Sequence, residues 1–155
     1  MSGALEEPFD HLYRAEADRL WRALAAFSGD ADLASDAVAE AFAQCIRRGG
    51  EVRDPRAWVW RAGFAIARGA LKERSRWRTL TELEDEPASD EGLVRLMQAL
   101  ARLSPKQRAA ILLRHYAGYR PHEVASMLGI APATVRVHLA RGRRSLAKLL
   151  EEGSE

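Results

Sequence analysis

The sequence predicts an all-α fold of two small helical domains joined by an acidic linker. Composition is the first reason: Ala and Leu together number 47, whereas Val, Ile and Thr number 14. That balance favours helices and leaves little material for a sheet. Apolar residues also recur at helical spacing in both halves of the chain. A Pro- and Ser-containing acidic stretch without helical periodicity, at 79–92, separates the two halves.

Charge alternates along the chain in four blocks. Residues 1–46 carry a net charge of −6, 47–78 carry +7, 79–92 carry −6 and 93–155 carry +7. Two separate basic blocks indicate two contacts with a polyanion. The alternative for each block is ordinary solvated helix surface. The acidic stretch is expected to be a soluble spacer; transient shielding of the basic faces is its alternative.

Several classes of protein are disfavoured. No apolar run approaches the roughly 18 residues of a membrane span, and 1–8 lack the basic and apolar regions of a signal peptide. We therefore expect a cytoplasmic protein without membrane insertion. One cysteine, Cys45, and four scattered histidines give no zinc-site spacing, so we expect neither metal nor cofactor. No nucleophile–base set is visible, and a Mg²⁺ site at Asp36 and Glu40 would lack a third carboxylate, so we expect no enzyme.

Two helices are expected at the start of the chain. The first spans 9–27 and ends at Ser28-Gly29-Asp30. The second spans 33–47, and its expected core residues are Leu33, Val38, Phe42, Cys45 and Ile46. Its other side shows three acidic residues four positions apart, which stack as one ridge. These residues are Asp32, Asp36 and Glu40.

A third helix follows the loop 48–55 and interleaves aromatic with basic side chains. Such a pattern suits a nucleic-acid strand whose bases unstack and whose backbone is neutralised. The candidate contacts are Trp60, Phe64, Arg68, Lys72, Arg76 and Trp77. Trp58 is expected in the core. For Trp60 and Trp77 two interpretations stay open, a core position and an exposed stacking platform for bases. Gly63 and Gly69 each cost about 1 kcal/mol relative to Ala, so we expect a loose helix.

Helix signals are strong beyond the linker. Leucines and Met97 recur at helical intervals from Leu93 to Leu103. Ser104 is an N-cap with Pro105 at the first helical position, and the helix that follows is expected to reach Tyr116. That helix is expected to bury Ile111, Leu112 and His115.

A helix-turn-helix unit is predicted at about 104–148. Val124, Ala125 and Leu128 face inward on a short helix that begins at Pro121, and Gly129 makes the turn. Pro132 opens a second helix, anchored by Val135 and Leu139. In this motif the second helix lies in the major groove of DNA.

The outward residues of that second helix are the candidate DNA contacts. Arg136 could take a guanine edge, and the cations after it could bind phosphates. The full candidate set is Thr134, Arg136, Val137, His138, Arg141, Arg143, Arg144 and Lys148. The alternative for the last cations is a solvated helix end, where positive charge complements the dipole.

These motifs resemble a known family. LSPKQRAAILLRHYAGYRPHEVASMLGIAPATVRVHLARGRRSLAKLL is similar to region 4 of bacterial RNA polymerase sigma factors of the extracytoplasmic-function (ECF) type. DLASDAVAEAFAQCIRR and DPRAWVWRAGFAIARGALKERSRW resemble region 2 of the same family. The resemblance implies a region 2 domain at 5–78, a linker at 79–92 and a region 4 domain at 93–150.

The resemblance also implies partners and roles. Asp32, Asp36 and Glu40 would bind the β′ clamp helices of core RNA polymerase, and region 4 would contact the β flap. The third helix would melt and read the −10 promoter strand. The helix-turn-helix would read the double-stranded −35 element. Family members are commonly held inactive by an anti-sigma factor, so such a partner is expected as well.

Two positions depart from the family pattern. Ala39 precedes Glu40 where the family commonly has Gln. Ala65 stands where relatives carry an Asn that holds a flipped-out promoter base. A DNA-binding regulator that keeps the sigma fold but does not initiate transcription is therefore the alternative hypothesis.

Overall fold

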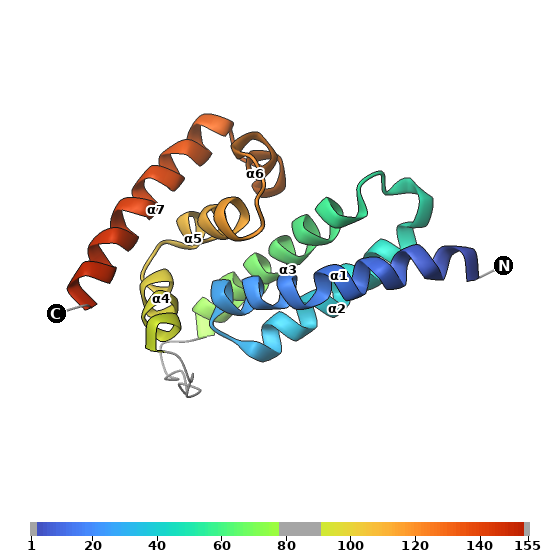
Figure 1. Cartoon of the computed structure of the whole chain (residues 1–155), viewed down its shortest axis with the longest axis horizontal. Coiled ribbons are helices and arrows are strands. Elements are labelled where there is room, and N and C mark those ends of the chain that lie inside the picture. Colours follow the sequence, from blue (N-terminus) through green and yellow to red (C-terminus); the bar gives the residue numbers. More distant parts are fainter. Residues whose placement is uncertain (1–2, 78–90, 154–155) are drawn as a thin grey trace. The chain divides into compact units, whose positions relative to one another are not determined.

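The computed structural model describes the backbone of residues 3–77 and 91–153 and the side chains of 8–74 and 91–152. Every regular element in these ranges is helical, as the sequence predicts (Figure 1). None of the described helices is both long and apolar enough to cross a membrane. The chain divides into two compact units, Met1–Glu73 and Arg74–Glu155.

Three helices build the first unit. They are α1 (Gly3–Ser28), α2 (Ala31–Arg48) and α3 (Pro55–Trp77), with a 3₁₀ turn η1 (Gly49–Glu51) after α2. The α1–α2 connection reverses at Gly29, whose φ of +70° suits glycine. Asp30 then caps α2 by accepting a hydrogen bond from the Leu33 amide at 3.0 Å.

The core of the first unit joins all three helices. Its largest fully buried side chains are Leu20, Leu24, Phe27, Val59, Trp60 and Phe64. Cys45 is buried as expected, and burial raises the pKa of its thiol. Gly63 lets α1 approach α3 closely, because a Cβ there would lie 3.3 Å from Leu20 and Leu24 methyl carbons. The expectation that Gly63 only loosens α3 is therefore incomplete, since the missing side chain makes room for α1.

Ile46, expected in this core, is instead 57% exposed, and Tyr13 on α1 is 49% exposed. The Tyr13 ring contacts the Phe42 ring edge to face, with centroids 5.0 Å apart. A three-helix unit this small covers only part of each apolar stripe.

Four α-helices build the second unit. They are α4 (Glu91–Ala101), α5 (Pro105–Ile111), α6 (Pro121–Leu128) and α7 (Pro132–Gly153), and a π-helical turn η2 (Leu112–Tyr116) follows α5. Residues 78–90 of the expected linker lie outside the described residues. Its last two residues, Glu91 and Gly92, belong instead to the first turn of α4. A glutamate in a first turn complements the helix dipole, which extends α4 beyond the apolar stripe.

The capping chemistry of this unit follows the prediction. The Ser104 hydroxyl accepts a hydrogen bond from the Gln107 amide at 3.2 Å. Gly129 ends α6 with a φ of +67°, and α7 begins at Pro132. Val124, Val135 and Leu139 are buried as expected.

Arg108 holds the corner between α4 and α5. Its guanidinium donates hydrogen bonds to the carbonyls of Leu100 at 2.8 Å, Ala101 at 3.1 Å and Leu103 at 2.9 Å. These carbonyls lie at or just beyond the end of α4, where helices leave acceptors without intrahelical donors. Burial lowers the pKa of Arg108, because the charged guanidinium loses hydration. The hydrogen bonds to the three carbonyls replace those that water would make.

Candidate nucleic-acid interfaces

The acidic ridge of α2 consists of Asp32, Asp36 and Glu40, and all three are exposed. The opposite face of α2 is buried against the rest of the unit, which points the ridge outward. Glu40 accepts hydrogen bonds from Gln44 at 2.9 Å and Arg47 at 3.0 Å. These two contacts, that from Gln44 first, hold the pKa of Glu40 below its usual value. Glu40 is therefore ionised at neutral pH.

A groove between α1 and α2 lies beside this ridge. It is lined by Tyr13, Arg14, Ala17, Asp18, Trp21, Ser35, Val38 and Ala39. The Trp21 indole donates a hydrogen bond to the Ser35 hydroxyl at 3.0 Å and so joins the two walls. On α2, Asp36 and Glu40 directly follow Ser35 and Ala39, so the ridge borders the α2 wall.

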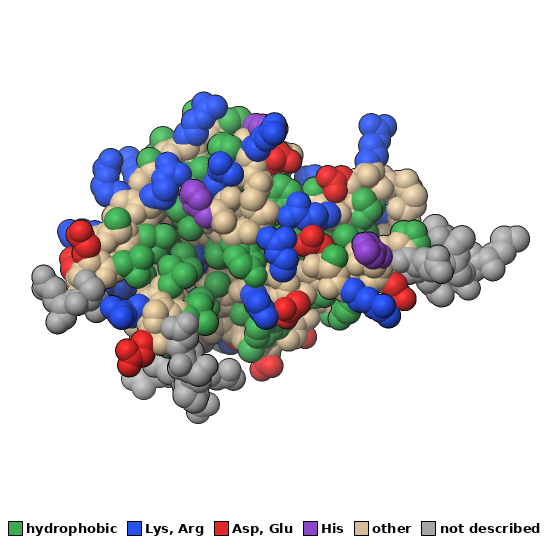
Figure 2. Space-filling view, in the orientation of Figure 1, with side chains coloured by type: hydrophobic (Ala, Val, Ile, Leu, Met, Phe, Trp, Pro, Cys, Tyr) green, Lys and Arg blue, Asp and Glu red, His purple; other side chains and the backbone are tan. Residues whose placement is uncertain are grey.

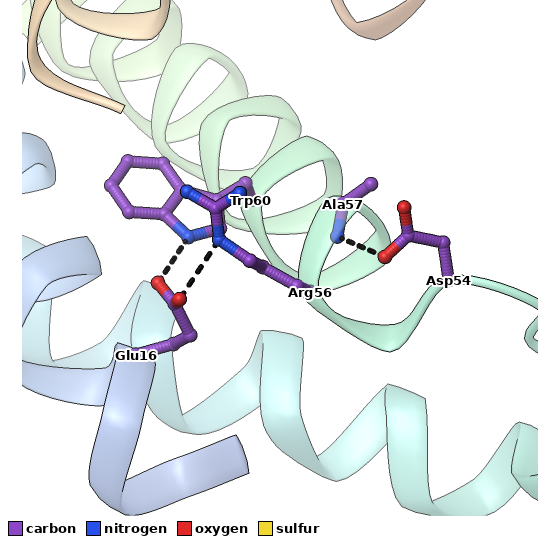
Figure 3. Close-up of polar contacts among 5 residues, drawn as sticks. All are labelled: Glu16, Asp54, Arg56, Ala57 and Trp60. Carbon is purple, nitrogen blue, oxygen red and sulfur yellow. Dashed lines mark hydrogen bonds and ion pairs between the residues drawn. The ribbon is translucent and has the colours of Figure 1, made fainter. Parts of the chain in front are cut away.

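Trp60 and Phe64 are not available as stacking platforms. Both side chains are 0% exposed, and their rings stack with centroids 6.3 Å apart. The Trp60 indole N–H points to a carboxylate oxygen of Glu16 at 3.0 Å (Figure 3). The expectation that Trp60 and Phe64 contact DNA is therefore wrong, because both the rings and the indole N–H are satisfied inside the unit.

Sequence reasoning missed Glu16 and Arg56. The second carboxylate oxygen of Glu16 accepts a hydrogen bond from Arg56 Nε at 2.8 Å. The signal was present: Glu16 lies four residues from both Leu12 and Leu20, within the apolar stripe of the first helix. A carboxylate on an apolar stripe is expected to be buried with a partner.

The exposed face of α3 carries a basic stripe. Lys72 is exposed and Arg68 is half-buried, and sequence reasoning missed the exposed Arg61. Ala65 is exposed one turn after Arg61 and lies on the same face. The side chains of Arg76 and Trp77 lie outside the described residues.

The second basic face is on α7. Figure 2 shows Lys and Arg side chains gathered along this helix. The exposed candidates are Thr134, Arg136, Val137, Arg141, Arg143, Arg144 and Lys148, and His138 is half-buried. Val135 at 0% and Leu139 at 3% exposure anchor the opposite side of α7 in the core. The candidate residues therefore lie on the part of α7 that does not pack against the core.

Two histidines of the second unit, His115 and His138, have pKa values below the ordinary one. Partial burial lowers the pKa of His138, and the positive charges of Lys106 and Arg141 lower it further. Partial burial, then Arg143 and Arg114, lower the pKa of His115. At neutral pH both rings are therefore uncharged.

His115 is exposed, contrary to the expectation of a core histidine. The π turn η2 explains this, because the Ala117 amide donates to the Leu112 carbonyl, five residues back, at 3.0 Å. The wider turn rotates later residues away from the buried stripe. His115 Nε2 instead lies 3.4 Å from Arg143 Nη1 on α7.

Comparison with known proteins assigns the family. Residues 93–146 match the family model "Sigma-70, region 4". The chain is 31% identical to the ECF RNA polymerase sigma factor SigL of Mycobacterium tuberculosis, over 91% of this chain and 88% of SigL. It is 32% identical to ECF sigma factor SigM of the same organism, over 92% of this chain and 76% of SigM.

A solved structure shares the fold. The sigma factor RpoE of Bartonella quintana, solved in complex with the anti-sigma factor NepR, aligns with a TM-score of 0.82 and 21% identity. The alignment covers 94% of this chain and 98% of RpoE. The similarity to SigL and SigM extends across both units, the three-helix unit and the helix-turn-helix unit alike. This chain belongs to the ECF RNA polymerase sigma factors.

Proposed function

We propose that this sigma factor serves in the cytoplasm as the promoter-specificity subunit of bacterial RNA polymerase, without catalytic activity of its own. The observation that carries the proposal is that each unit exposes a basic helix face, on α3 and on α7. The chain is about 31% identical to a sigma factor across both units. Two such faces in one chain suit two promoter elements.

Core polymerase binds the first unit, at the acidic ridge and the neighbouring α1–α2 groove. The ridge supplies negative charge, and the groove supplies aromatic and aliphatic surface. An interface of this kind fits a partner helix that carries basic and apolar side chains, as expected for the β′ clamp helices. The β flap is the corresponding partner of the second unit.

Promoter DNA binds the two basic faces. The exposed face of α3, with Arg61, Arg68 and Lys72, neutralises the melted −10 strand. The outer face of α7 enters the major groove of the −35 element, where Arg136 reads a base edge. The later cations of α7, from Arg141 to Lys148, bind phosphates and set the register.

An anti-sigma factor is the regulatory partner. Support comes from the RpoE fold relative, which was solved with one bound. The second unit also exposes leucines, Leu93 at 50% and Leu96 at 38% on α4, which an apolar partner helix would cover. An anti-sigma factor of this chain, purified in complex with it after co-expression, should abolish run-off transcription. A candidate protein that leaves transcription unchanged is not the anti-sigma factor.

Run-off transcription with purified core polymerase tests the function. The full-length protein should direct initiation from promoters recovered from a matched genomic library. Asp36→Lys/Glu40→Lys should abolish co-purification with core polymerase and remove the run-off product. The matched control is Asp10→Lys/Glu51→Lys, which reverses two exposed carboxylates outside the ridge and groove and should retain both properties. Operator-like DNA binding by the free chain, without initiation on any promoter, would contradict the proposal.

Salt dependence separates phosphate contacts from base contacts. Lys148→Gln should weaken promoter binding by the holoenzyme on every sequence alike. It should also reduce the slope of log K against log salt by about 0.9. Arg136→Ala should instead relax discrimination at one −35 base pair, by about 1–3 kcal/mol. Identical behaviour of the two variants would contradict these roles.

A further inference from the structure

Glu16 is a buried carboxylate that has no role in the proposed −10 and −35 DNA contacts. It lies in the middle of α1, is 7% exposed and ends in two hydrogen bonds to α3. One oxygen accepts from Arg56 Nε at 2.8 Å and the other from Trp60 Nε1 at 3.0 Å (Figure 3). A single carboxylate of α1 thus holds two side chains of α3 that are one turn apart.

This arrangement determines the rotation of α3 about its own axis. Arg56 and Trp60 are four residues apart and share one face of the helix. Successive residues of an α-helix are about 100° apart around the axis. With Trp60 directed at Glu16, Arg61 and Ala65 lie about 100° and 140° away around the helix, and both are exposed. A change in rotation would carry the basic stripe away from its present direction.

The apolar contacts around α3 specify its rotation less sharply. Trp60, Phe64 and the neighbouring residues are buried, but hydrophobic burial is non-directional. The close approach at Gly63 favours the same rotation by shape, because a larger side chain there would meet Leu20 and Leu24. Hydrogen bonds to a buried carboxylate are directional, because misalignment leaves a desolvated charge without its donors.

We propose that Glu16 is a positioning residue for promoter opening. It does not touch nucleic acid; through Arg56 and Trp60 it holds α3 so that Arg61 and Lys72 meet the −10 strand. This inference rests on the proposed function, in which the exposed face of α3 binds that strand. It gives a buried polar cluster a role in promoter opening as well as in folding.

Two variants of the full-length protein test the inference. Glu16→Gln keeps the size of the side chain but removes the charge that faces Arg56. Glu16→Met/Arg56→Met/Trp60→Phe replaces the whole polar set by apolar side chains, with a smaller ring at the fully buried position 60. Apolar replacement of a buried ion pair commonly preserves or raises stability, whereas the smaller ring lowers it, so the free energy of unfolding of this variant is measured alongside. The triple variant therefore separates folding from positioning. Asp10→Asn, an exposed carboxylate on α1, is the matched control.

The assay follows opening of the −10 region by holoenzyme with a 2-aminopurine-labelled promoter, at a temperature where circular dichroism shows every variant folded. We expect both Glu16 variants to bind core polymerase within about twofold of wild type, because the α2 ridge is untouched. Opening should fall on the order of tenfold in both, including the folded triple variant. The Trp60 indole N–H resonance should move in Glu16→Gln and stay in place in Asp10→Asn.

Each outcome has a distinct meaning. Full opening by the triple variant would overturn the inference, because the cluster would then serve stability alone. Full opening by Glu16→Gln with an unchanged indole resonance would overturn it too. If wild-type holoenzyme itself fails to open any promoter, the proposed function fails and the inference fails with it. If wild type opens and the variants open equally well, only the inference fails.

Discussion

Two glycines of α3 should respond oppositely to the same substitution. Gly69 is exposed, and a Cβ there would meet nothing within 4 Å. Gly69→Ala should therefore stabilise the first unit by up to about 1 kcal/mol, the difference in helix propensity. A Cβ at Gly63 would lie 3.3 Å from Cδ1 and Cδ2 of Leu20 and from Cδ1 of Leu24. Both leucines are 0% exposed, so neither side chain has free space to move into.

Overpacking at Gly63 should outweigh the gain in propensity. Extra methylene-sized groups in a filled core typically cost about 1–3 kcal/mol. Gly63→Ala should thus be neutral to destabilising by about 2 kcal/mol, once the roughly 1 kcal/mol propensity gain is subtracted. The two variants should differ by about 1–3 kcal/mol in the free energy of unfolding. In a domain of this size, 1 kcal/mol corresponds to about 4–8 °C in Tm.

Tryptophan fluorescence is a selective assay for this comparison. Three of the four tryptophans, Trp21, Trp58 and Trp60, lie in the first unit, so most of the emission reports its unfolding. Thermal and urea unfolding of the two full-length variants would give both midpoints. Equal stabilisation by Gly63→Ala and Gly69→Ala would refute the close α1–α3 approach.

Three further predictions concern the second unit. Arg108→Met should destabilise it by about 2–3 kcal/mol, measured by amide exchange, because three carbonyls lose charge-assisted hydrogen bonds; exposed Arg102→Met is the control. Gly142→Ala should destabilise it by up to about 2 kcal/mol in urea unfolding followed by circular dichroism, because the Cβ would lie 2.9 Å from the Ile111 side chain of α5 and this overpacking offsets the gain in helix propensity. His115 and His138 have folded-state pKa values below the ordinary 6.5, so the unfolded chain binds more protons. Stability of the unit should thus fall as the pH drops below about 6.5, and His115→Gln should weaken that fall; an unchanged pH profile would contradict the assignment.

Local chemistry determined much of the second unit. Ser104 caps α5, Pro121 and Pro132 begin their helices, and Gly129 adopts a positive φ, all at the predicted positions. Each of these depends on the backbone preference of one residue and its near neighbours. The anchors Val135 and Leu139 were equally predictable, since helical spacing places them together on one face.

Tertiary packing decided what periodicity leaves open. Helical spacing shows which residues share a face, but Trp60 and Phe64 could have faced either the core or a DNA strand. The structure turns both inward, and Glu16, 44 residues from Trp60 in sequence, supplies an acceptor for the indole N–H. Similarly, the π turn that exposes His115 changes the register of faces within one helix, and periodicity assumes a constant register.

The sequence by itself therefore determined the all-α fold, the helix ends around the turn and the outward residues of α7. Those features depend on composition, capping and short-range spacing. The tertiary structure decided the rotation of α3, the space that Gly63 gives to α1 and the groove beside the acidic ridge. These features depend on contacts between residues far apart in the chain, and no local preference encodes which partners will meet.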